Sequence, residues 1–310
     1  MSDLIYIVTE EDELQCTPVY THIRRHFNLS SRLRGKIKRE KLVLLNGEPV
    51  ESYIVPMAGD EIKIKMPEEV SYFPPEDVPF DVLLEDDDIL AINKPAGYVV
   101  HPTYGFEDAT IANGISKYMY DNGRPFKIRF INRLDMDTSG VLLVAKNAYT
   151  QNDYTMQQKL GEVRKEYVAV VFGKVAEDEG IIDAPIGKPD PEKPFRGVVP
   201  DGKPSQTEYK VLERFEGNEY CKDGYSLVRL RLLTGRTHQI RVHMKHIGHT
   251  LVGDEFYGGQ CDELIKRQAL HAAYLSFKHP HSKELLKLEA PLPEDMETLI
   301  NKLRDSSKLL

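Results

Sequence analysis

The sequence predicts an α+β protein in which a small N-terminal αβ module precedes a larger domain built on a mainly antiparallel sheet. Beyond residue 80, most apolar segments are short and alternate or are rich in β-branched residues, as strands are, and few helical patterns separate them. Residues 67–80 are rich in proline and acidic residues and have no periodicity, which is typical of a linker. We therefore expect a module over 1–66, a linker over 67–80 and a domain over 81–310.

Length and composition fit a globular protein with about two domains. The chain has 310 residues and a formal net charge of −8, from 41 basic and 49 acidic residues. No apolar run approaches the roughly 20 residues that a membrane span needs, and the chain does not begin with a signal-peptide pattern. Its three cysteines are scattered singly, unlike a disulfide framework or paired zinc ligands. We expect a cytoplasmic protein without membrane contacts.

The first 66 residues contain patterns for two helices and a small sheet. Apolar side chains repeat every fourth position over 19–27, which indicates an amphipathic helix, and Ser30 is placed to cap a second one. Asn46 and Gly47 form a strong hairpin-turn signal, and the alternating stretch 61–66 predicts a strand after it.

The two predicted helices carry a basic island in an otherwise acidic protein. Over residues 24–41, Glu40 is the only acidic residue. Clustered cations of this kind either contact RNA or DNA phosphates or form a solvated helix face. The residues predicted to contact RNA here are Arg24, Arg25, Arg32, Arg34, Lys36, Lys38 and Arg39.

In the larger domain, strands are expected in DILAINKP, over 128–134, and in VLLVAKN, EYVAVVFG, TEYKVLERF and YSLVRLRLL. Helical patterns cover about 148–160, 237–247 and 294–304. The Pro- and Gly-rich segment 183–206 is predicted to be a long loop without identifiable chemistry.

Residues 131–140, INRLDMDTSG, resemble the start of a calcium-binding loop. Asp135, Asp137 and Ser139 match its first ligand positions, with Gly140 at the turn. The twelfth position, which must supply a glutamate, is Lys146, and the flanks are strand-like. A calcium site is therefore not expected.

An ordinary turn and an active site both remain possible for this segment. Asp, Thr, Ser and Gly are common between strands. If the strand from Ile128 continues, however, its alternation points Arg133 and Asp135 to one face and Asn132 to the other. A guanidinium beside a carboxylate at a strand end is also a functional geometry.

Residues 232–259 contain a second polar cluster. Thr237 is placed to cap a helix with several histidines, but His238 and His243 fall on different faces and no HExxH pattern occurs, so a metal is not expected. From this helix Arg241 could reach a carboxylate, or it could be a surface arginine. Tyr167, at the start of a strand, says little alone.

Taken together, these segments resemble the RluA/RluD pseudouridine synthases. NRLDMDTSGVLLVAK resembles the H-R-L-D-x-x-T-S-G motif of that family, RKEYVAVVFG its tyrosine motif, and LLTGRTHQIRVHMKHIGHTLVGDEFYGG its arginine motif. The likeness covers about residues 80–292, and EDDDILAINKPAGYVVHP upstream also agrees. It implies a mixed, mainly antiparallel sheet with a cleft across its middle. The basic module resembles the RNA-binding domain named after a small-subunit ribosomal protein.

The resemblance implies isomerisation of uridine to its carbon-linked isomer without a cofactor. It assigns the catalytic aspartate to Asp135, the tyrosine to Tyr167 and the arginine to Arg241. Asp135 would engage the ribose or base, or take a ribose proton, while Arg241 keeps it ionised and aimed. Tyr167 would stack on the uracil, and Arg133 would support a nucleotide extruded from its helix.

The resemblance also implies RNA as the partner, with large-subunit ribosomal RNA as the expected substrate and transfer RNA as the next. We expect the protein to be a monomer. Asn132 departs from the motif, which usually has histidine there; from strand alternation we expect the chemistry to survive but recognition to differ. The remaining residues expected to contact RNA are Asn132, Arg133, Thr138, Arg236, His238 and Gln239.

Two other functions compete with an active synthase. One is an RNA-binding or ribosome-assembly factor with the same fold and no activity, which Asn132 leaves open and the three matched catalytic residues oppose. The other is a zinc-dependent base deaminase, which is excluded because the chain lacks its H-x-E and P-C-x-x-C signatures.

Overall fold

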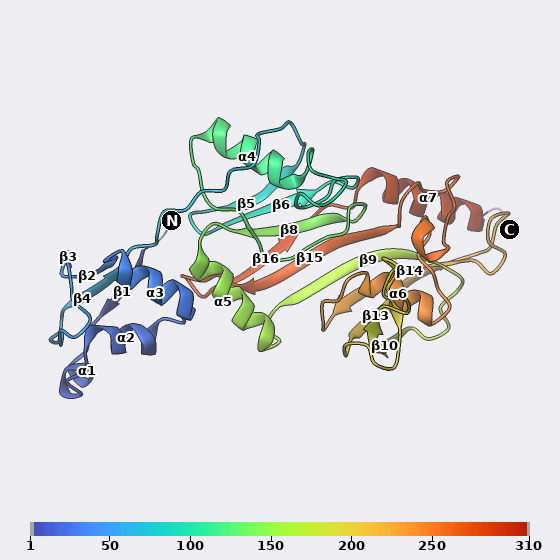
Figure 1. The fold of residues 1–310 in the computed structure, drawn as a ribbon. Coiled ribbons are helices and arrows are strands. Elements are labelled where there is room, and N and C mark those ends of the chain that lie inside the picture. The colour runs from blue at the N-terminus through green and yellow to red at the C-terminus, as the bar shows by residue number, and fades with distance from the viewer. Residues whose placement is uncertain (1–2, 309–310) are drawn as a thin grey trace.

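The computed structural model describes residues 3–308 as a small N-terminal unit beside a long sheet (Figure 1). The ends of the predicted domain ranges, residues 1–2 and 309–310, lie outside the described residues. The N-terminal unit lies at one end of the molecule, near α5 (Ala148–Lys159), and α7 (Glu294–Lys308) runs toward the other end. Within the described range no helix has the length and apolar character of a membrane span.

The N-terminal unit is a four-stranded sheet with three helices. Its strands are in the order β1-β4-β2-β3. Ser30 caps α3 as predicted, because its Oγ accepts a hydrogen bond from the Leu33 N–H at 3.2 Å. Asn46 and Gly47 have positive φ angles of 51° and 89° and join two paired strands, which confirms the hairpin. The elements are β1 (Leu4–Ile7), α1 (Glu10–Leu14), α2 (Val19–His26), α3 (Ser31–Arg39), β2 (Val43–Leu45), β3 (Glu48–Pro49) and β4 (Glu61–Ile64).

The core of this unit extends to α5. Val19, Ile23 and Ile62 are almost fully buried, and the ring of Tyr149 on α5 belongs to the same apolar cluster. The next segment, 67–80, forms no helix or strand. Glu69 within it is paired with Lys36 at 3.1 Å, so ion pairs attach this segment to its surroundings. The division into 1–66, 67–80 and 81–310 stays a prediction.

The large sheet confirms the predicted α+β class. Its strand order is β10-β13-β14-β9-β15-β8-β6-β5, with β16 beside β15 and β7 beside β8. The described pairings are antiparallel except that between β15 and β8. The strands are β5 (Asp81–Glu85), β6 (Ile89–Lys94), β7 (Arg129–Phe130), β8 (Ser139–Ala145), β9 (Arg164–Phe172), β10 (Glu179–Asp183), β13 (Gln206–Phe215), β14 (Tyr225–Leu232), β15 (Leu270–Lys278) and β16 (Leu285–Glu289).

Several elements of the fold differ from those expected from the sequence. The strand expected over 128–134 is only the two-residue β7, because the chain then enters the turn that carries Asp135. The expected loop 183–206 contains a short hairpin of β11 (Ile186–Gly187) and β12 (Gly197–Val198). A helix that was not predicted, α4 (Ile111–Asn122), covers one side of the sheet (Figure 1).

Candidate active site

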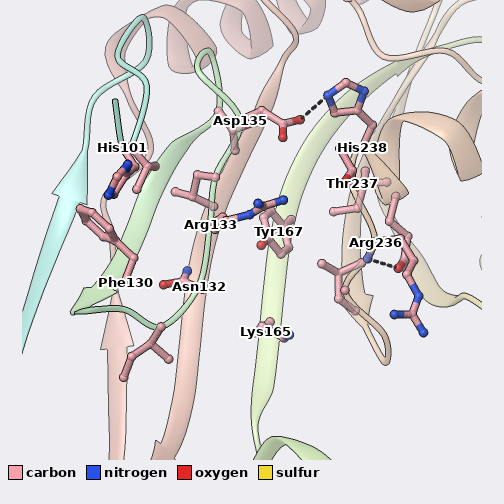
Figure 2. Close-up of a pocket in the computed structure, with 18 of the residues that line it drawn as sticks. His101, Phe130, Asn132, Arg133, Asp135, Lys165, Tyr167, Arg236, Thr237 and His238 are labelled. Carbon is pink, nitrogen blue, oxygen red and sulfur yellow. Dashed lines mark hydrogen bonds and ion pairs between the residues drawn. The ribbon is translucent and has the colours of Figure 1, made fainter. Parts of the chain in front are cut away.

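A cavity of about 900 Å³ opens where β9, the loop before β8 and the start of α6 (Gln239–His246) meet. Its volume is within the range of small-molecule sites. Asp135, Tyr167 and Arg241 line it, so the structure brings together three residues that are far apart in the sequence. Figure 2 shows Asp135 on the loop, Tyr167 on β9 and His238 opposite Asp135.

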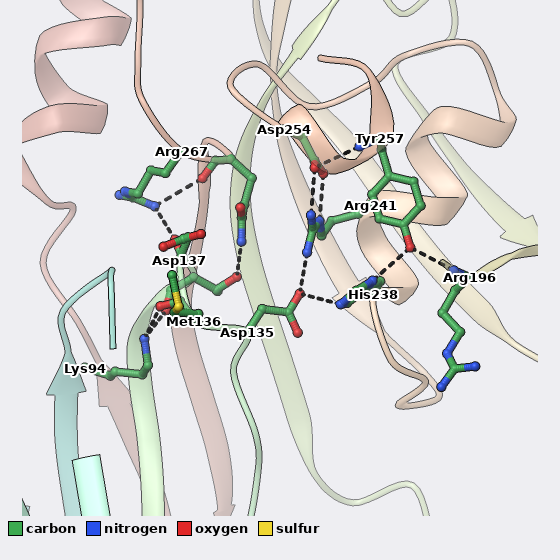
Figure 3. A network of polar contacts seen from close by, with 12 residues as sticks. Lys94, Asp135, Met136, Asp137, Arg196, His238, Arg241, Asp254, Tyr257 and Arg267 are labelled. Atoms are coloured by element: carbon green, nitrogen blue, oxygen red, sulfur yellow. Dashed lines mark hydrogen bonds and ion pairs between the residues drawn. The ribbon is translucent and has the colours of Figure 1, made fainter. Parts of the chain in front are cut away.

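The loop that carries Asp135 is held by a buried lysine. Lys94, at the end of β6, donates from Nζ to the carbonyl oxygens of Met136 at 2.7 Å, Pro95 at 2.8 Å and Thr138 at 3.0 Å (Figure 3). Burial lowers the pKa of Lys94 to about 7, although the charge of Asp137 acts in the other direction. Lys94 therefore fixes the backbone of the turn that follows Asp135.

Gly140 allows this loop to join the sheet closely. Its φ is +113°, and a Cβ at this position would lie 2.2 Å from the carbonyl oxygen of Ala272 on β15. Only glycine fits this approach without displacing a strand. The close approach therefore places the Asp135 loop directly beside the junction of β8 and β15.

Asn132 is bound to β8. Its side-chain amide donates to the Val141 carbonyl oxygen at 3.0 Å and accepts from the Leu143 N–H at 2.8 Å. We expected from strand alternation that Asn132 points away from Asp135. This expectation is wrong, because no strand continues through 132–135. Both residues line the cavity. The side-chain amide of Asn132 thus binds the backbone of β8 in place of a neighbouring strand.

Arg241 connects two carboxylates. Its guanidinium donates to Asp254 from Nε and Nη2, each at 2.7 Å, and to Oδ2 of Asp135 from Nη1 at 3.1 Å (Figure 3). Of the two alternatives for Arg241, the structure supports the one that reaches a carboxylate. The Asp254 side chain is fully buried, whereas that of Asp135 is 30% exposed.

The charges at this centre do not cancel. Burial disfavours the charge of Arg241, but the hydrogen bonds and charge of Asp254, and then Asp135, outweigh it and raise the Arg241 pKa. One cation thus faces two carboxylates. Arg241 donates two of its three hydrogen bonds to Asp254 and only one to Asp135. The carboxylate of Asp135, which lines the cavity, therefore keeps lone pairs that Arg241 does not occupy.

His238 lies on the other side of Asp135. Its Nε2 is 3.9 Å from Asp135 Oδ2, and its Nδ1 is 2.8 Å from the Tyr257 hydroxyl, which also accepts from the Arg196 N–H at 3.2 Å. The hydroxyl proton is then free to bind Nδ1, which favours the tautomer with the proton on Nε2. Burial lowers the His238 pKa, so this ring is neutral at pH 7.

The helix begins differently from the prediction. Thr237 does not cap it; His238 is the N-cap and has a left-handed backbone with φ 56°. Such a conformation is uncommon outside glycine and is often found at functional sites. It turns the His238 ring toward Asp135 (Figure 2).

Tyr167 is 7% exposed in the cavity. Burial and then the nearby charge of Asp135 raise the pKa of its hydroxyl well above the ordinary value, so the side chain is a neutral phenol at pH 7. The ring therefore offers a flat apolar face and a proton donor in the same place.

The other predicted RNA contacts near the cavity differ in accessibility. Arg133 and Arg236 are exposed at its rim. Thr138 and Gln239 are only 2% exposed. The Gln239 side chain bonds to the Arg236 N–H at 2.9 Å, which gives it an internal role in the turn before α6.

The basic island lies outside this cavity, in the N-terminal unit. Arg34 and Lys36 are half-buried and have internal partners: Arg34 donates to the Leu29 carbonyl oxygen at 2.6 Å, and Lys36 pairs with Glu69. The exposed members are Arg24, Arg25, Arg32, Lys38 and Arg39.

Sequence reasoning missed three residues that hold the site: Lys94, Asp254 and Tyr257. All three lie in stretches that resemble the family, and this resemblance was the available signal. Local spacing gave no further indication, because Lys94 and Tyr257 bind residues that are far away in the sequence.

Known proteins resemble this chain over the part that forms the cavity. A family model described as RNA pseudouridylate synthase matches residues 88–246, which contain Asp135, Tyr167 and Arg241. The chain belongs to the RNA pseudouridine synthase family. This pseudouridine synthase is of the RluA/RluD type and is therefore an isomerase, as the sequence predicted.

Two relatives resemble this pseudouridine synthase over most of their length. It is 37% identical over 297 residues to ribosomal large subunit pseudouridine synthase D of Pasteurella multocida, covering 90% of this chain and 88% of that protein. It is 42% identical over 269 residues to the uncharacterized RNA pseudouridine synthase YlyB of Bacillus subtilis, covering 84% and 86%.

A solved structure shares the fold. Human RNA pseudouridylate synthase domain containing 1 has a TM-score of 0.58 and 27% identity to this pseudouridine synthase, and the match covers 75% of this chain and 98% of the human one.

Proposed function

We propose that this pseudouridine synthase isomerises specific uridines of large-subunit ribosomal RNA, with Asp135 as its catalytic carboxylate. The observation that carries the proposal is the position of Asp135: it lies in the cavity and is bound by an arginine that Asp254 already holds in place. Transfer RNA is the second candidate substrate.

The reaction breaks the bond between the ribose and a ring nitrogen and forms one to a ring carbon, whose proton leaves. A carboxylate can assist by bonding covalently to the nucleotide or by taking a ribose proton. Asp135 suits either role, since it is partly accessible and carries one hydrogen bond from Arg241. The roles of Arg241, and of Asp254 behind it, are to aim Asp135 and balance part of its charge.

Tyr167 is assigned to the base. Its buried ring would stack on the extruded uracil, and its hydroxyl would then stand close to the ring carbon that loses a proton. The charge of Asp135 contributes to the raised pKa of Tyr167. If Asp135 bonds covalently to the nucleotide, that negative charge disappears and the pKa of the Tyr167 hydroxyl falls. The hydroxyl then gives up its proton more easily, and the phenolate that results can act as a base.

The nucleotide must leave its helix to reach this cavity. A volume of about 900 Å³ accommodates an extruded nucleotide. Arg133, exposed at the rim, is proposed to fill the vacated space or to bind a phosphate. The basic N-terminal helices are proposed to contribute affinity through further phosphates.

The choice of ribosomal RNA is supported by the resemblance to ribosomal large subunit pseudouridine synthase D of Pasteurella multocida. The experiment uses purified protein and unmodified transcripts of large-subunit ribosomal RNA and transfer RNAs, with pseudouridine mapped by mass spectrometry. Wild type should modify discrete ribosomal sites, and Asp135→Asn should modify none. Asp121→Asn is the matched control, because Asp121 is an exposed carboxylate on α4 that does not line the cavity, and it should retain activity.

The same experiment, with RNA binding measured on the same transcripts, separates the alternatives. Full activity of Asp135→Asn would overturn the assigned mechanism, and modification of transfer RNA alone would replace the substrate. Wild-type protein that binds ribosomal RNA but modifies neither RNA would support the inactive assembly factor.

A further inference from the structure

We propose that Asp12, His22 and His26 bind a divalent transition-metal ion of the Zn²⁺ class in the N-terminal unit. Asp12 lies on α1, and the two histidines are one turn apart on α2. The proposal is independent of the catalytic roles assigned above. It departs from the sequence-based expectation of no metal, which considered the cysteines, residues 131–140 and the histidines of residues 238–246 but not Asp12, His22 and His26.

The three ligand atoms are spaced for one ion. Asp12 Oδ1 lies 3.6 Å from His22 Nδ1 and 3.6 Å from His26 Nε2, and all three atoms lie within 4.8 Å of one another. Zinc bonds of about 2.0–2.1 Å at tetrahedral angles separate ligand atoms by roughly 3.3 Å. A small inward shift therefore completes three bonds.

His22 has the protonation pattern of a metal ligand. Its Nε2 lies 3.0 Å from the Thr17 hydroxyl and 3.1 Å from the Thr17 carbonyl oxygen. The carbonyl can only accept and the hydroxyl can accept as well, so a proton on Nε2 satisfies both contacts. This leaves a lone pair on Nδ1. The residue is 1% exposed, and within the described part of the chain Nδ1 has no hydrogen-bond partner. A buried lone pair directed at a carboxylate is costly unless a cation lies between them.

Asp12 is held as a carboxylate with one oxygen free. The Tyr6 hydroxyl and the Thr9 hydroxyl and N–H all donate to Oδ2, and the hydrogen bond from Tyr6, followed by that from Thr9, lowers the Asp12 pKa. Oδ1 faces the two imidazoles. Ligating carboxylates are typically oriented by such secondary hydrogen bonds.

His26 gives the site access to solvent. Its side chain is 31% exposed, and its ring stacks on that of Tyr6 with centroids 3.7 Å apart, which fixes its orientation. With three protein ligands, a fourth position remains for water. The bound ion would clamp α1 onto α2, the helix that presents the basic residues Arg24 and Arg25.

A second group of similar composition does not have this pattern. Asp86, Asp88 and His279 are also close together. There, however, His279 Nδ1 accepts from the N–H groups of His281 and Ser282, so the proton is on Nε2, which donates to Asp86 at 3.1 Å. That histidine is already satisfied without a metal.

The test measures Zn²⁺ bound to the full chain. Metal-free protein is dialysed against micromolar free Zn²⁺, and bound metal is counted by elemental mass spectrometry. Wild type should bind one ion per chain and unfold at a higher temperature with Zn²⁺ than without. His26→Gln should weaken binding by at least about tenfold and lose the thermal shift. His26 is chosen because it is partly exposed; circular dichroism of the metal-free variant checks that it folds.

Two variants are matched controls. His279→Gln removes a histidine from the other group, and Cys16→Ser removes an exposed thiol close in sequence to α1; both should bind as wild type does. The proposal is overturned if wild type binds no Zn²⁺, if folded His26→Gln binds it equally well, or if binding is lost in Cys16→Ser or His279→Gln.

Discussion

Asp254 binds Arg241 through two hydrogen bonds of 2.7 Å, and this pair directs the third guanidinium hydrogen bond to Asp135. The inner carboxylate is fully buried and the outer one partly exposed, so the arginine connects the protein interior to the cavity. The direction of Asp135 therefore depends on a residue that is not itself part of the cavity wall.

Asp254→Asn tests this dependence. An asparagine replaces one acceptor oxygen by an N–H₂ group that faces guanidinium donors, so Arg241 should turn away from Asp135. We expect the turnover number to fall about a hundredfold, with a smaller change in KM, because small misplacements at a reacting centre have this effect.

Steady-state kinetics on an RNA substrate checks the result. Breaking a buried pair should also reduce the free energy of unfolding by about 3–5 kcal/mol, measured with denaturant. Glu255→Gln, one residue further on, serves as control. Wild-type turnover in Asp254→Asn would mean that Arg241 does not need the carboxylate of Asp254 to be oriented toward Asp135.

Two substitutions of Tyr167 distinguish the role of its ring from the role of its hydroxyl. Tyr167→Phe keeps the stacking face, so RNA affinity should change little while turnover falls by about 10² to 10⁴, the range for loss of a proton-transferring group. Tyr167→Leu should lose affinity as well. Single-turnover rates and filter binding measure the two effects; equal turnover in wild type and Tyr167→Phe would remove the hydroxyl from the chemistry.

The exposed residues of the basic island should control the salt dependence of RNA binding. Alanine at Arg24, Arg25, Arg32, Lys38 and Arg39 together should reduce the slope of log affinity against log salt concentration by about 0.7 to 0.9 for each phosphate that is no longer neutralised. The control is the pair Arg34→Ala and Lys36→Ala, whose side chains have internal partners. If the five-residue variant keeps the wild-type slope, the island is a solvated face.

Lys94 should make activity sensitive to pH. Its pKa is lowered from 10.5 to about 7 by burial, so above pH 7 it becomes a neutral amine with two N–H groups for three carbonyl oxygens. The Asp135 loop should then loosen and turnover fall as pH rises through 7. Turnover is measured from pH 6 to 9 for wild type and Lys94→Met, and the variant should lack this decline.

The effect of Lys94 on stability has the opposite sign. Between about pH 7 and 10.5 the unfolded chain keeps a proton on Lys94 that the folded protein has lost, so this group's contribution to stability increases with pH over that range. Denaturation at pH 7 and 9 should show a larger gain for wild type than for Lys94→Met. Equal slopes in both proteins would mean that Lys94 does not titrate in this range.

Local patterns predicted much of this fold. Ser30 and the Asn46-Gly47 turn were found because their effects act within a few residues. In contrast, α4 was missed, and strand alternation was wrongly extended to Asn132 because nothing local marks the end of β7. The alternation of residues in the sequence cannot show that β7 ends at Phe130. The residues after it are held by contacts with another strand, as Asn132 is by its hydrogen bonds to β8.

The site itself was predicted only in part. Motif resemblance brought Asp135, Tyr167 and Arg241 together, and the structure places all three in one cavity. The two supporting residues depend on contacts between distant positions: Asp254 binds Arg241 across 13 positions, and Lys94 binds Met136 and Thr138 across 42 and 44. No pattern of spacing records which carboxylate an arginine will bind, because the fold decides it.

The position of β15 has a consequence for synthesis of the protein. Residues 270–278 lie between β8 and β9 in the sheet although they follow both by a long stretch of chain. A nascent polypeptide that has emerged only through α6 contains Asp135, Tyr167 and Arg241 but lacks the strand that joins the two halves of the sheet. The cavity can close only when this late strand is inserted, a step of high contact order that makes activity one of the last properties the growing chain acquires.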